Sequence, residues 1–175
     1  MPVSSPRREP ELAVAEREPQ LLEAQRIFDE LGRAEVDFVI VGGLAVQTHG
    51  GTRMTNDVDL IPAPDPANLA RLADALRAIE AQVLNPGHED LEIDAAMLPR
   101  ATIWQFATRY GDVDVLHDAP GAAPYPELRE RALVISLEDT RVPVAGRDDL
   151  IRMKLARGRP IDRADVAALT DPEGD

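Results

Sequence analysis

The chain has 175 residues, which is enough for one domain with its own core and too few for two. It contains no cysteine, so disulfides and thiolate metal sites are excluded, and any metal must be bound by carboxylate, imidazole or water. The formal net charge of −13 argues against a broad surface for duplex nucleic acid. Neither a membrane-spanning apolar run nor a signal-peptide pattern is evident, so we expect a cytoplasmic protein with no membrane partner.

The first 19 residues differ in composition from the rest of the chain. They are polar and contain four of the 15 prolines, so they lack the apolar surface that a packed element needs. We expect a flexible arm at residues 1–19 and a single domain at residues 20–170. The last part of that domain, residues 147–170, is expected to form C-terminal helices.

The first half of the domain is predicted from apolar periodicity and from Gly and Pro signals. In chain order we expect a helix from Gln20 that Gly32 ends, a strand at 36–41, a helix from Gly43 to Gly50, a strand at 57–61 and a helix at 64–83. The strand at 36–41 is short, β-branched and almost wholly apolar, as is typical of a strand buried on both faces.

The second half shows weaker strand patterns followed by two helices. We expect strands at 91–98, 101–109 and 112–118, a strand pair within 132–146, and helices at 147–160 and 162–169. A turn at Tyr110-Gly111 joins the second and third of these strands. Because strands and helices alternate, the expected class is α/β (α+β), with a mixed central β-sheet flanked by helices.

Two aspartates on the 57–61 strand carry the first chemical signal. Side chains two apart on a strand share a face, so Asp57 and Asp59 point the same way and Val58 points the other way. Two carboxylates about 6 to 7 Å apart repel by roughly 2 to 3 kcal/mol at an effective dielectric near 20. Mg²⁺ is a natural compensator, because it binds carboxylate oxygens together with substrate phosphates. The alternative is an exposed strand edge with solvated charges, which the apolar neighbours disfavour.

A metal site for phosphate chemistry commonly uses a third carboxylate from another strand. The 112–118 strand supplies Asp112 and Asp114 on one face. We favour Asp114 as a metal ligand, or as the base toward an acceptor hydroxyl, because Asp112 adjoins the turn and could cap it. The alternative, that both are turn or edge charges, stays open at this point.

The segment before these aspartates resembles a known signature. VGG at 41–43, followed after thirteen residues by DVDL at 57–60, resembles the hydrophobic-Gly-Gly/Ser…Asp-x-Asp/Glu pattern of the DNA polymerase β-like nucleotidyltransferase superfamily. The stretch GGTRMTNDVDL at 50–60 is similar to AbiEii-type, toxin-like bacterial nucleotidyltransferases.

The resemblance implies a minimal nucleotidyltransferase fold with Mg²⁺, or Mn²⁺ in its place, bound by Asp57 and Asp59. It implies transfer of a nucleoside monophosphate from ATP or another nucleoside triphosphate, with Gly42 and Gly43 admitting the phosphates. An RNA or tRNA end fits as acceptor, and a small hydroxylated molecule is the alternative. An antitoxin or a second copy of the chain is the expected protein partner.

Residues 147–163 form a basic island in this acidic chain, with six basic residues against three acids. Lys154, the only lysine, falls within the apolar arc of its predicted helix, where an ammonium group needs a partner. Arg157 lies beside the same arc. Toxin-type relatives carry a lysine in a similar K-x-x-A segment, which implies that Lys154 and Arg157 bind the triphosphate. The alternative is that Lys154 extends past the edge of the core into solvent.

Five further residues carry weaker signals. Arg53 and Thr55 precede the aspartates and are expected to contact phosphate, or only to complete the loop. Arg159, Asp162 and Asp165 resemble an R-x-x-D-x-x-D segment of the family. The same spacing equally suits a helix N-cap at Asp162 and a first-turn acid at Asp165.

Other candidate groups are less promising. Trp104 and Phe106 share a strand face and are expected in the core rather than stacked on a base. His49, His88 and His117 are scattered along the chain, which disfavours a histidine metal site.

The leading hypothesis is therefore a Mg²⁺-dependent nucleotidyltransferase. A nucleotide- or partner-binding module without turnover is one alternative, and a metal-dependent phosphohydrolase is another. They remain open because a fold does not settle a function.

Overall fold

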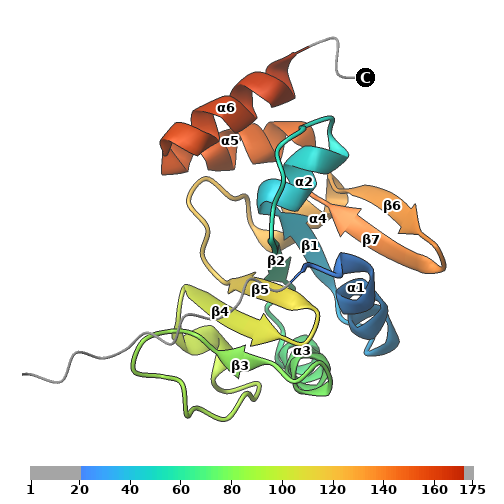
Figure 1. The fold of residues 1–175 in the computed structure, drawn as a ribbon, viewed down its shortest axis with the longest axis vertical. Helices are drawn as coiled ribbons and strands as arrows, with labels where there is room; N and C mark the ends of the chain where they lie inside the picture. The colour runs from blue at the N-terminus through green and yellow to red at the C-terminus, as the bar shows by residue number, and fades with distance from the viewer. Residues whose placement is uncertain (1–20, 172–175) are drawn as a thin grey trace, which may run out of the picture.

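A seven-stranded mixed sheet with strand order β3-β4-β5-β2-β1-β7-β6 forms the centre of the computed structural model (Figure 1). The structure describes residues 21–171, so the arm predicted at residues 1–19 lies outside the described residues. The strands are β1 (Phe38–Val41), β2 (Asp57–Pro62), β3 (Gln82–Val83), β4 (Ile103–Thr108), β5 (Gly111–Leu116), β6 (Leu133–Leu137) and β7 (Thr140–Val144). The helices are α1 (Ala24–Arg33), α2 (Gly42–Thr48), α3 (Pro66–Ala78), α4 (Tyr125–Glu130), α5 (Arg147–Arg157) and α6 (Pro160–Thr170), with a 3₁₀ turn at Leu98–Arg100. The predicted α/β class is confirmed.

The centre of the sheet is built from β1, β2 and β5. All four residues of β1 are buried, as its continuous apolar sequence predicts for a strand covered on both faces. β2 pairs with β1 in an antiparallel ladder and with β5 in a parallel one. Because β2 lies between these two strands, its side chains are held in a fixed register against both.

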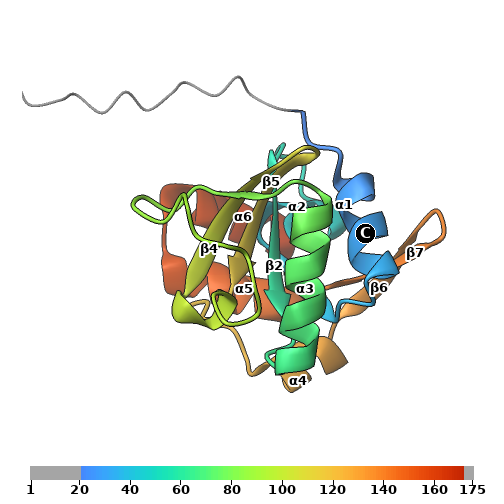
Figure 2. The same cartoon turned by 90° about the horizontal axis from the view of Figure 1, so that it is seen from below.

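Helices cover both faces of the sheet. Figure 2 shows α3 in front of the sheet, with α5 and α6 behind it. On the α3 side, Val58 and Leu60 of β2 are fully buried, as expected of the face opposite the aspartates. Local sequence starts α3 at Pro66, because the Asp65 carboxylate accepts a hydrogen bond from the Asn68 backbone N–H.

Two predictions in the middle of the chain are wrong. Residues 91–98 form no strand. They form a loop from which Ile93, Met97 and Leu98 insert into the core. Arg77 donates a hydrogen bond to the Ile93 carbonyl and so anchors the backbone of this loop. The helix predicted to reach residue 83 ends at Ala78.

The early end of α3 has a backbone cause. Glu80 adopts a left-handed conformation with φ of 58°, so the chain reverses direction there. Gln82 and Val83 then pair with β4 as the short strand β3. The apolar periodicity of this stretch did not reveal that reversal.

Two smaller differences remain, one in the bounds of α1 and one in a short helix that no prediction named. α1 begins later than predicted, at Ala24, and runs through Gly32 to Arg33. The short helix α4 was not predicted, because Pro124 and Pro126 resemble a loop. A proline in the first helical turn is in fact compatible with a helix.

Candidate active site

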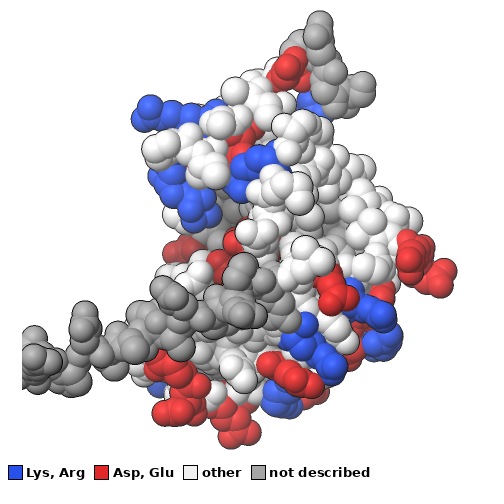
Figure 3. Space-filling model, viewed as in Figure 1, with Lys and Arg blue, Asp and Glu red and all other residues white. Residues whose placement is uncertain are grey.

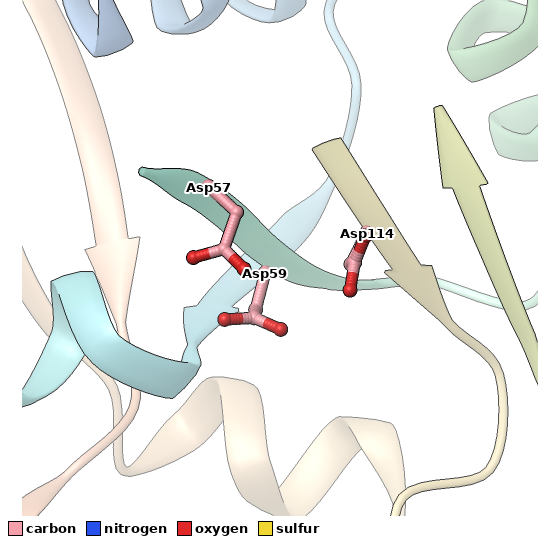
Figure 4. Close-up of side chains that lie close together, drawn as sticks. All are labelled: Asp57, Asp59 and Asp114. Atoms are coloured by element: carbon pink, nitrogen blue, oxygen red, sulfur yellow. The ribbon is translucent and has the colours of Figure 1, made fainter. Parts of the chain in front are cut away.

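Three aspartates meet on one face of the central sheet. β2 and β5 are parallel neighbours in which Asp59 lies directly opposite Asp114, and Asp57 precedes Asp59 on the same face. One carboxylate oxygen from each of Asp57, Asp59 and Asp114 lies within 4.8 Å of the others. Figure 4 shows the three side chains pointing into the same space, two from β2 and one from β5. We call this group the carboxylate cluster.

The carboxylate cluster is electrostatically strained. Burial raises the pKa of Asp59 to about 7, and the charges of Asp57 and Asp114 add to the rise. Burial likewise raises the pKa of Asp114 to about 6, although a hydrogen bond from Gln105 opposes the rise. The side chain of Asp59 is only 9% exposed, so water cannot fully offset this repulsion.

The cluster lacks a cationic partner in direct contact. Thr55 donates a hydrogen bond of 2.5 Å to Asp57, and Gln105 donates one of 3.3 Å to Asp114. Within residues 21–171, no lysine or arginine forms an ion pair with any of the three carboxylates. Three convergent carboxylates with unmet charge are the donor set that a hard divalent cation binds, so the residues present fit Mg²⁺ or Mn²⁺.

A glycine corner brings β1 and α2 against the cluster. Gly42 has a φ of 68°, and a Cβ atom at this position would lie 1.8 Å from Oδ2 of Asp59. A Cβ at Gly43 would lie 2.8 Å from Oγ1 of Thr55. Both glycines are therefore required by close contact with the Asp59 and Thr55 side chains, and Gly42 also by its backbone conformation.

A cavity of about 420 Å³ opens beside Asp59. Its walls come from the ends of β1 and β5, the start of β4, the loop after β5 and the inner face of α5. The lining residues are Val41, Gly42, Asp59, Thr102, Ile103, Leu116, Asp118, Ala119, Pro120, Leu150, Met153, Lys154 and Arg157. Mostly apolar walls with a few charged groups at one end are typical of a small-molecule site.

Positive charge faces the cluster from α5 and α6. Figure 3 shows Lys and Arg side chains gathered over this part of the molecule, with Asp and Glu side chains across a hollow. Arg157 is exposed, lines the cavity, and lowers the pKa values of Asp59 and Asp114 through its charge. We call the space that contains the carboxylate cluster and the adjoining cavity the cleft. Its acidic groups come from β2 and β5, and its basic groups come from α5.

Comparison with known proteins agrees with this geometry. A family model described as "Nucleotidyltransferase of unknown function (DUF6036)" matches residues 20–170. The chain belongs to this family. Membership of the nucleotidyltransferase superfamily, predicted from residues 41–60, is confirmed, whereas the AbiEii-type likeness stays a prediction. A comparison with curated proteins found no match.

Solved structures with a similar fold include other nucleotidyltransferases. The lincosamide antibiotic adenylyltransferase LnuA, bound to lincomycin, has a TM-score of 0.60 at 13% identity over 87% of this chain and 98% of LnuA. The antibiotic-resistance factor ANT(2'')-Ia has a TM-score of 0.54 at 15% identity, covering 83% and 79% of the two chains. A nucleotidyltransferase-type protein from Thermotoga maritima has a TM-score of 0.53 at 13% identity, covering 85% and 93%. At these identities the likeness concerns the fold alone.

In this member of the nucleotidyltransferase family, Lys154 is buried rather than extended into solvent. It is 4% exposed, and its Nζ lies 2.7 Å from Asp165 Oδ2 and 3.4 Å from Asp162 Oδ1. An ammonium group within an apolar arc needs a partner, and Lys154 has two, the carboxylates of Asp162 and Asp165 on α6. The same side chain still lines the cavity beside Arg157.

The other predicted residues divide between the cleft and its support. Arg53 lies beside Gly43, and its guanidinium group binds Asp165. Thr55 binds Asp57 as described above. The N-cap of α6 is Arg159 and not Asp162, because the helix begins at Pro160; Asp162 lies in the first turn and accepts hydrogen bonds from the Arg159 side chain and backbone N–H.

Neighbouring groups fall outside the carboxylate cluster. Asp112 lies opposite Asp57 in the β2–β5 register but is not one of its three members. Trp104 and Phe106 are buried in the core, and the Trp104 indole N–H donates to the Leu98 carbonyl, as the core interpretation predicts.

Sequence analysis left two functional features unassigned. Gln105 was not singled out, although its alternation with Trp104 and Phe106 places it on the Asp114 face. The apolar cavity depends on segments that are distant in sequence, so no local pattern could reveal it.

No helix among the described residues is long and apolar enough to cross a bilayer.

Proposed function

We propose that this protein is a divalent-metal-dependent nucleotidyltransferase that transfers a nucleoside monophosphate from a nucleoside triphosphate to a hydroxyl group. The observation that carries the proposal is the convergence of Asp57, Asp59 and Asp114 opposite Arg157, at the mouth of a cavity. Family membership supports the reaction class.

The carboxylate cluster would hold Mg²⁺, or Mn²⁺ in its place. When bound, such an ion supplies positive charge at the phosphate oxygens and lowers the pKa of an oxygen that it contacts. Asp59, the most buried of the three, also meets the glycine corner, so its orientation is fixed by Gly42.

The chain's own residues would then align the reactants. In the transfer, the acceptor oxygen forms a bond to the α-phosphorus while the bond from that phosphorus to the pyrophosphate oxygen breaks. Asp114 would accept the hydroxyl proton, because it lies opposite Asp59 in the β2–β5 ladder and on the same face. Arg157 would neutralise charge on the phosphates, and the apolar cavity walls would pack against the nucleoside.

The charge distribution favours a small hydroxylated acceptor over an RNA end. Three of the six basic groups of residues 147–163, those of Arg152, Lys154 and Arg159, are bound to aspartates. That leaves less free charge for a phosphate backbone. Two structures of similar fold hold small antibiotics or their adenylylated product, lincomycin in LnuA and adenylyl-2''-tobramycin in ANT(2'')-Ia. The antitoxin partner and the homodimer stay predictions.

The test is transfer of radioactive label from each α-labelled nucleoside triphosphate in the presence of Mg²⁺. Acceptors would be aminoglycosides, lincosamides and simple polyols on one side and tRNA and total RNA on the other. We expect label on a small acceptor. Nucleotide binding without transfer would support the binding-module alternative, and release of labelled monophosphate into water would support a hydrolase.

Asp57→Ala and Asp59→Ala provide the matched controls for this assay. Both variants are expected to fold and to lose transfer, because each removes a carboxylate from the cluster. Undiminished transfer by either one would contradict the assigned metal site.

A further inference from the structure

Asp165 on α6 is a buried carboxylate that binds two cations from two other segments. It is 3% exposed, and it lies 2.7 Å from the Lys154 ammonium group on α5. It also accepts hydrogen bonds of 3.0 and 3.4 Å from Nε and Nη2 of Arg53, in the loop before β2. Burial raises its pKa, but the hydrogen bonds from Lys154 and Arg53 outweigh that effect and lower the pKa overall.

Both cations border the cleft described above. Lys154 lines the cavity beside Asp59. The Arg53 guanidinium reaches the glycine corner, where its Nη2 would lie 2.9 Å from a Cβ at Gly43. One buried carboxylate therefore binds two positive groups that border the cleft, one at the cavity and one at the glycine corner.

Arg53 also belongs to the loop that leads into the carboxylate cluster. Its carbonyl accepts a hydrogen bond of 2.5 Å from Gln47 on α2, and two residues later Thr55 donates to Asp57. Asp165 on α6 is thus connected to Asp57 through Arg53, which binds Asp165, and through Thr55 of the same loop, which binds Asp57.

The charge around Asp165 stays positive. Arg53, Lys154 and Arg159 face Asp162 and Asp165, which leaves three positive charges against two negative ones. Arg159 is bound by Asp162, so Asp165 is left to orient the two cations nearest the cleft. A triphosphate chain would meet cations that are already oriented, which is how a site stabilises transferred charge without reorganising.

We propose that Asp165 is a positioning residue of this active site, which holds Arg53 and Lys154 in place for the triphosphate of the nucleotide. The inference rests on the proposed function. Loss of the Asp165 carboxylate leaves both cations present, with Arg53 released from its ion pair and Lys154 held by Asp162 alone.

Asp149 offers a matched control elsewhere on α5. It is 1% exposed and, like Asp165, it binds two cations, Arg131 and Arg152. Neither of those arginines lines the cavity or contacts the glycine corner. Asp149→Asn and Asp165→Asn therefore remove equivalent charges, one remote from the cleft and one beside it.

The experiment measures binding of inorganic triphosphate in the presence of Mn²⁺ by calorimetry, together with the melting temperature. We expect both variants to melt somewhat below the wild type, and only Asp165→Asn to bind triphosphate about 10-fold more weakly. Wild-type affinity in Asp165→Asn would overturn the inference. An equal loss of affinity in Asp149→Asn would overturn it as well, since general loosening would then explain the result.

Arg53→Lys keeps the test decisive should Asp165→Asn fail to fold. Arg53 is one-third exposed, and lysine keeps the charge but cannot make both hydrogen bonds to Asp165. We expect about 5-fold weaker triphosphate binding, and unchanged binding would overturn the inference. Where Asp165→Asn does fold, the double variant should bind no more weakly than Asp165→Asn alone.

The same measurement separates this inference from the proposed function. Failure of the wild type to bind triphosphate with Mn²⁺ would overturn both. Binding by the wild type without transfer to any acceptor would overturn only the enzymatic proposal. The difference between Asp165→Asn and Asp149→Asn would still decide the role of Asp165.

Discussion

Two groups of buried or half-buried aspartates in this protein have opposite electrostatic surroundings. Asp149, Asp162 and Asp165 each contact arginine or lysine, and the pKa of each is lowered. Asp59 and Asp114 face other carboxylates, and their pKa values are raised to about 7 and about 6. Arg157 of α5 lies at the same cleft, but it forms no ion pair with either of them.

The difference distinguishes carboxylates that stabilise the fold from carboxylates that serve a ligand. A buried ion pair that is already complete contributes to the native state and has no further need of charge. A set of convergent carboxylates without a counterion is costly to bury, and its cost is relieved when a cation binds. On this basis, we propose that the carboxylate cluster serves a ligand, that Asp165 supports it, and that Asp149 serves the fold.

Neutralising Asp59 tests most strongly whether the carboxylate cluster differs in role from the ion-paired aspartates of α5 and α6. Asp59→Asn should lower the transfer rate by roughly 1,000-fold, because metal-assisted charge stabilisation is worth several kcal/mol. Stability without metal should be unchanged or increased, since a repelled buried charge is removed. Rates with Mg²⁺ and melting curves in a chelator would check both parts.

Asp112→Asn is the matched control for that variant, because Asp112 lies on the same two-strand ladder but outside the cluster. It should change the transfer rate by less than about 10-fold. A similar loss in both variants would remove the special role of Asp59.

The glycine corner gives the next largest effect. Gly42→Ala places a Cβ within 1.8 Å of the Asp59 carboxylate, so Asp59 must move, and transfer should fall by about 100-fold. Gly87→Ala is the control, because Gly87 also has a positive φ, 79°, but nothing lies within 4 Å of its added Cβ. That control should lose about 1 kcal/mol of stability and no activity. Equal activities of the two variants would contradict the assigned contact.

The effect of Mg²⁺ on the free energy of unfolding gives a second test of the difference between the two groups of aspartates. At a Mg²⁺ concentration about 100 times Kd, the free energy of unfolding of the wild type should rise by about 2.7 kcal/mol. Asp59→Asn should show little of this increase, whereas Asp149→Asn should show all of it. Chemical denaturation with and without Mg²⁺ measures the difference. An increase of the same size in Asp59→Asn would place the metal elsewhere.

The smallest effect concerns acid stability. Asp149 has a folded-state pKa below its unfolded value of about 3.9, so its stabilisation is present above that pH and is lost as the pH falls through the folded-state pKa. Asp149→Asn should therefore cost about 1 kcal/mol at neutral pH, and the difference from the wild type should shrink below about pH 4. Denaturation midpoints between pH 7 and pH 3 would test this, and a gap that widens on acidification would reverse the assignment.

The sequence predicted those parts of the site that depend on local geometry. The shared face of Asp57 and Asp59 follows from strand alternation alone, and the burial of Lys154 follows from its place in the apolar arc of α5. Sequence analysis favours Asp114 over Asp112 because Asp112 adjoins the turn, but only the register between β2 and β5 shows that Asp114 lies opposite Asp59. The predicted strand at residues 91–98 was wrong because apolar residues of a loop can enter a core without pairing.

Partnerships between distant segments were likewise beyond sequence analysis. The spacing of Asp162 and Asp165 was compatible with capping or with a site role, and only the docking of α6 against α5 separated the two. Asp162 binds Arg159 at the start of α6, whereas Asp165 reaches Lys154 and Arg53. The apolar cavity likewise requires β4, β5 and α5 to be in place together.

The parallel pairing of β2 with β5 has a consequence for the order of events in folding. Asp59 and Asp114 are separated in sequence by α3, β3 and β4, and pairings between such distant strands form slowly. A nascent or partly unfolded chain therefore carries two of the three carboxylates near one another but no complete chelate. Capture of the ion should report completion of the sheet, which would keep immature chains from acting on nucleotides.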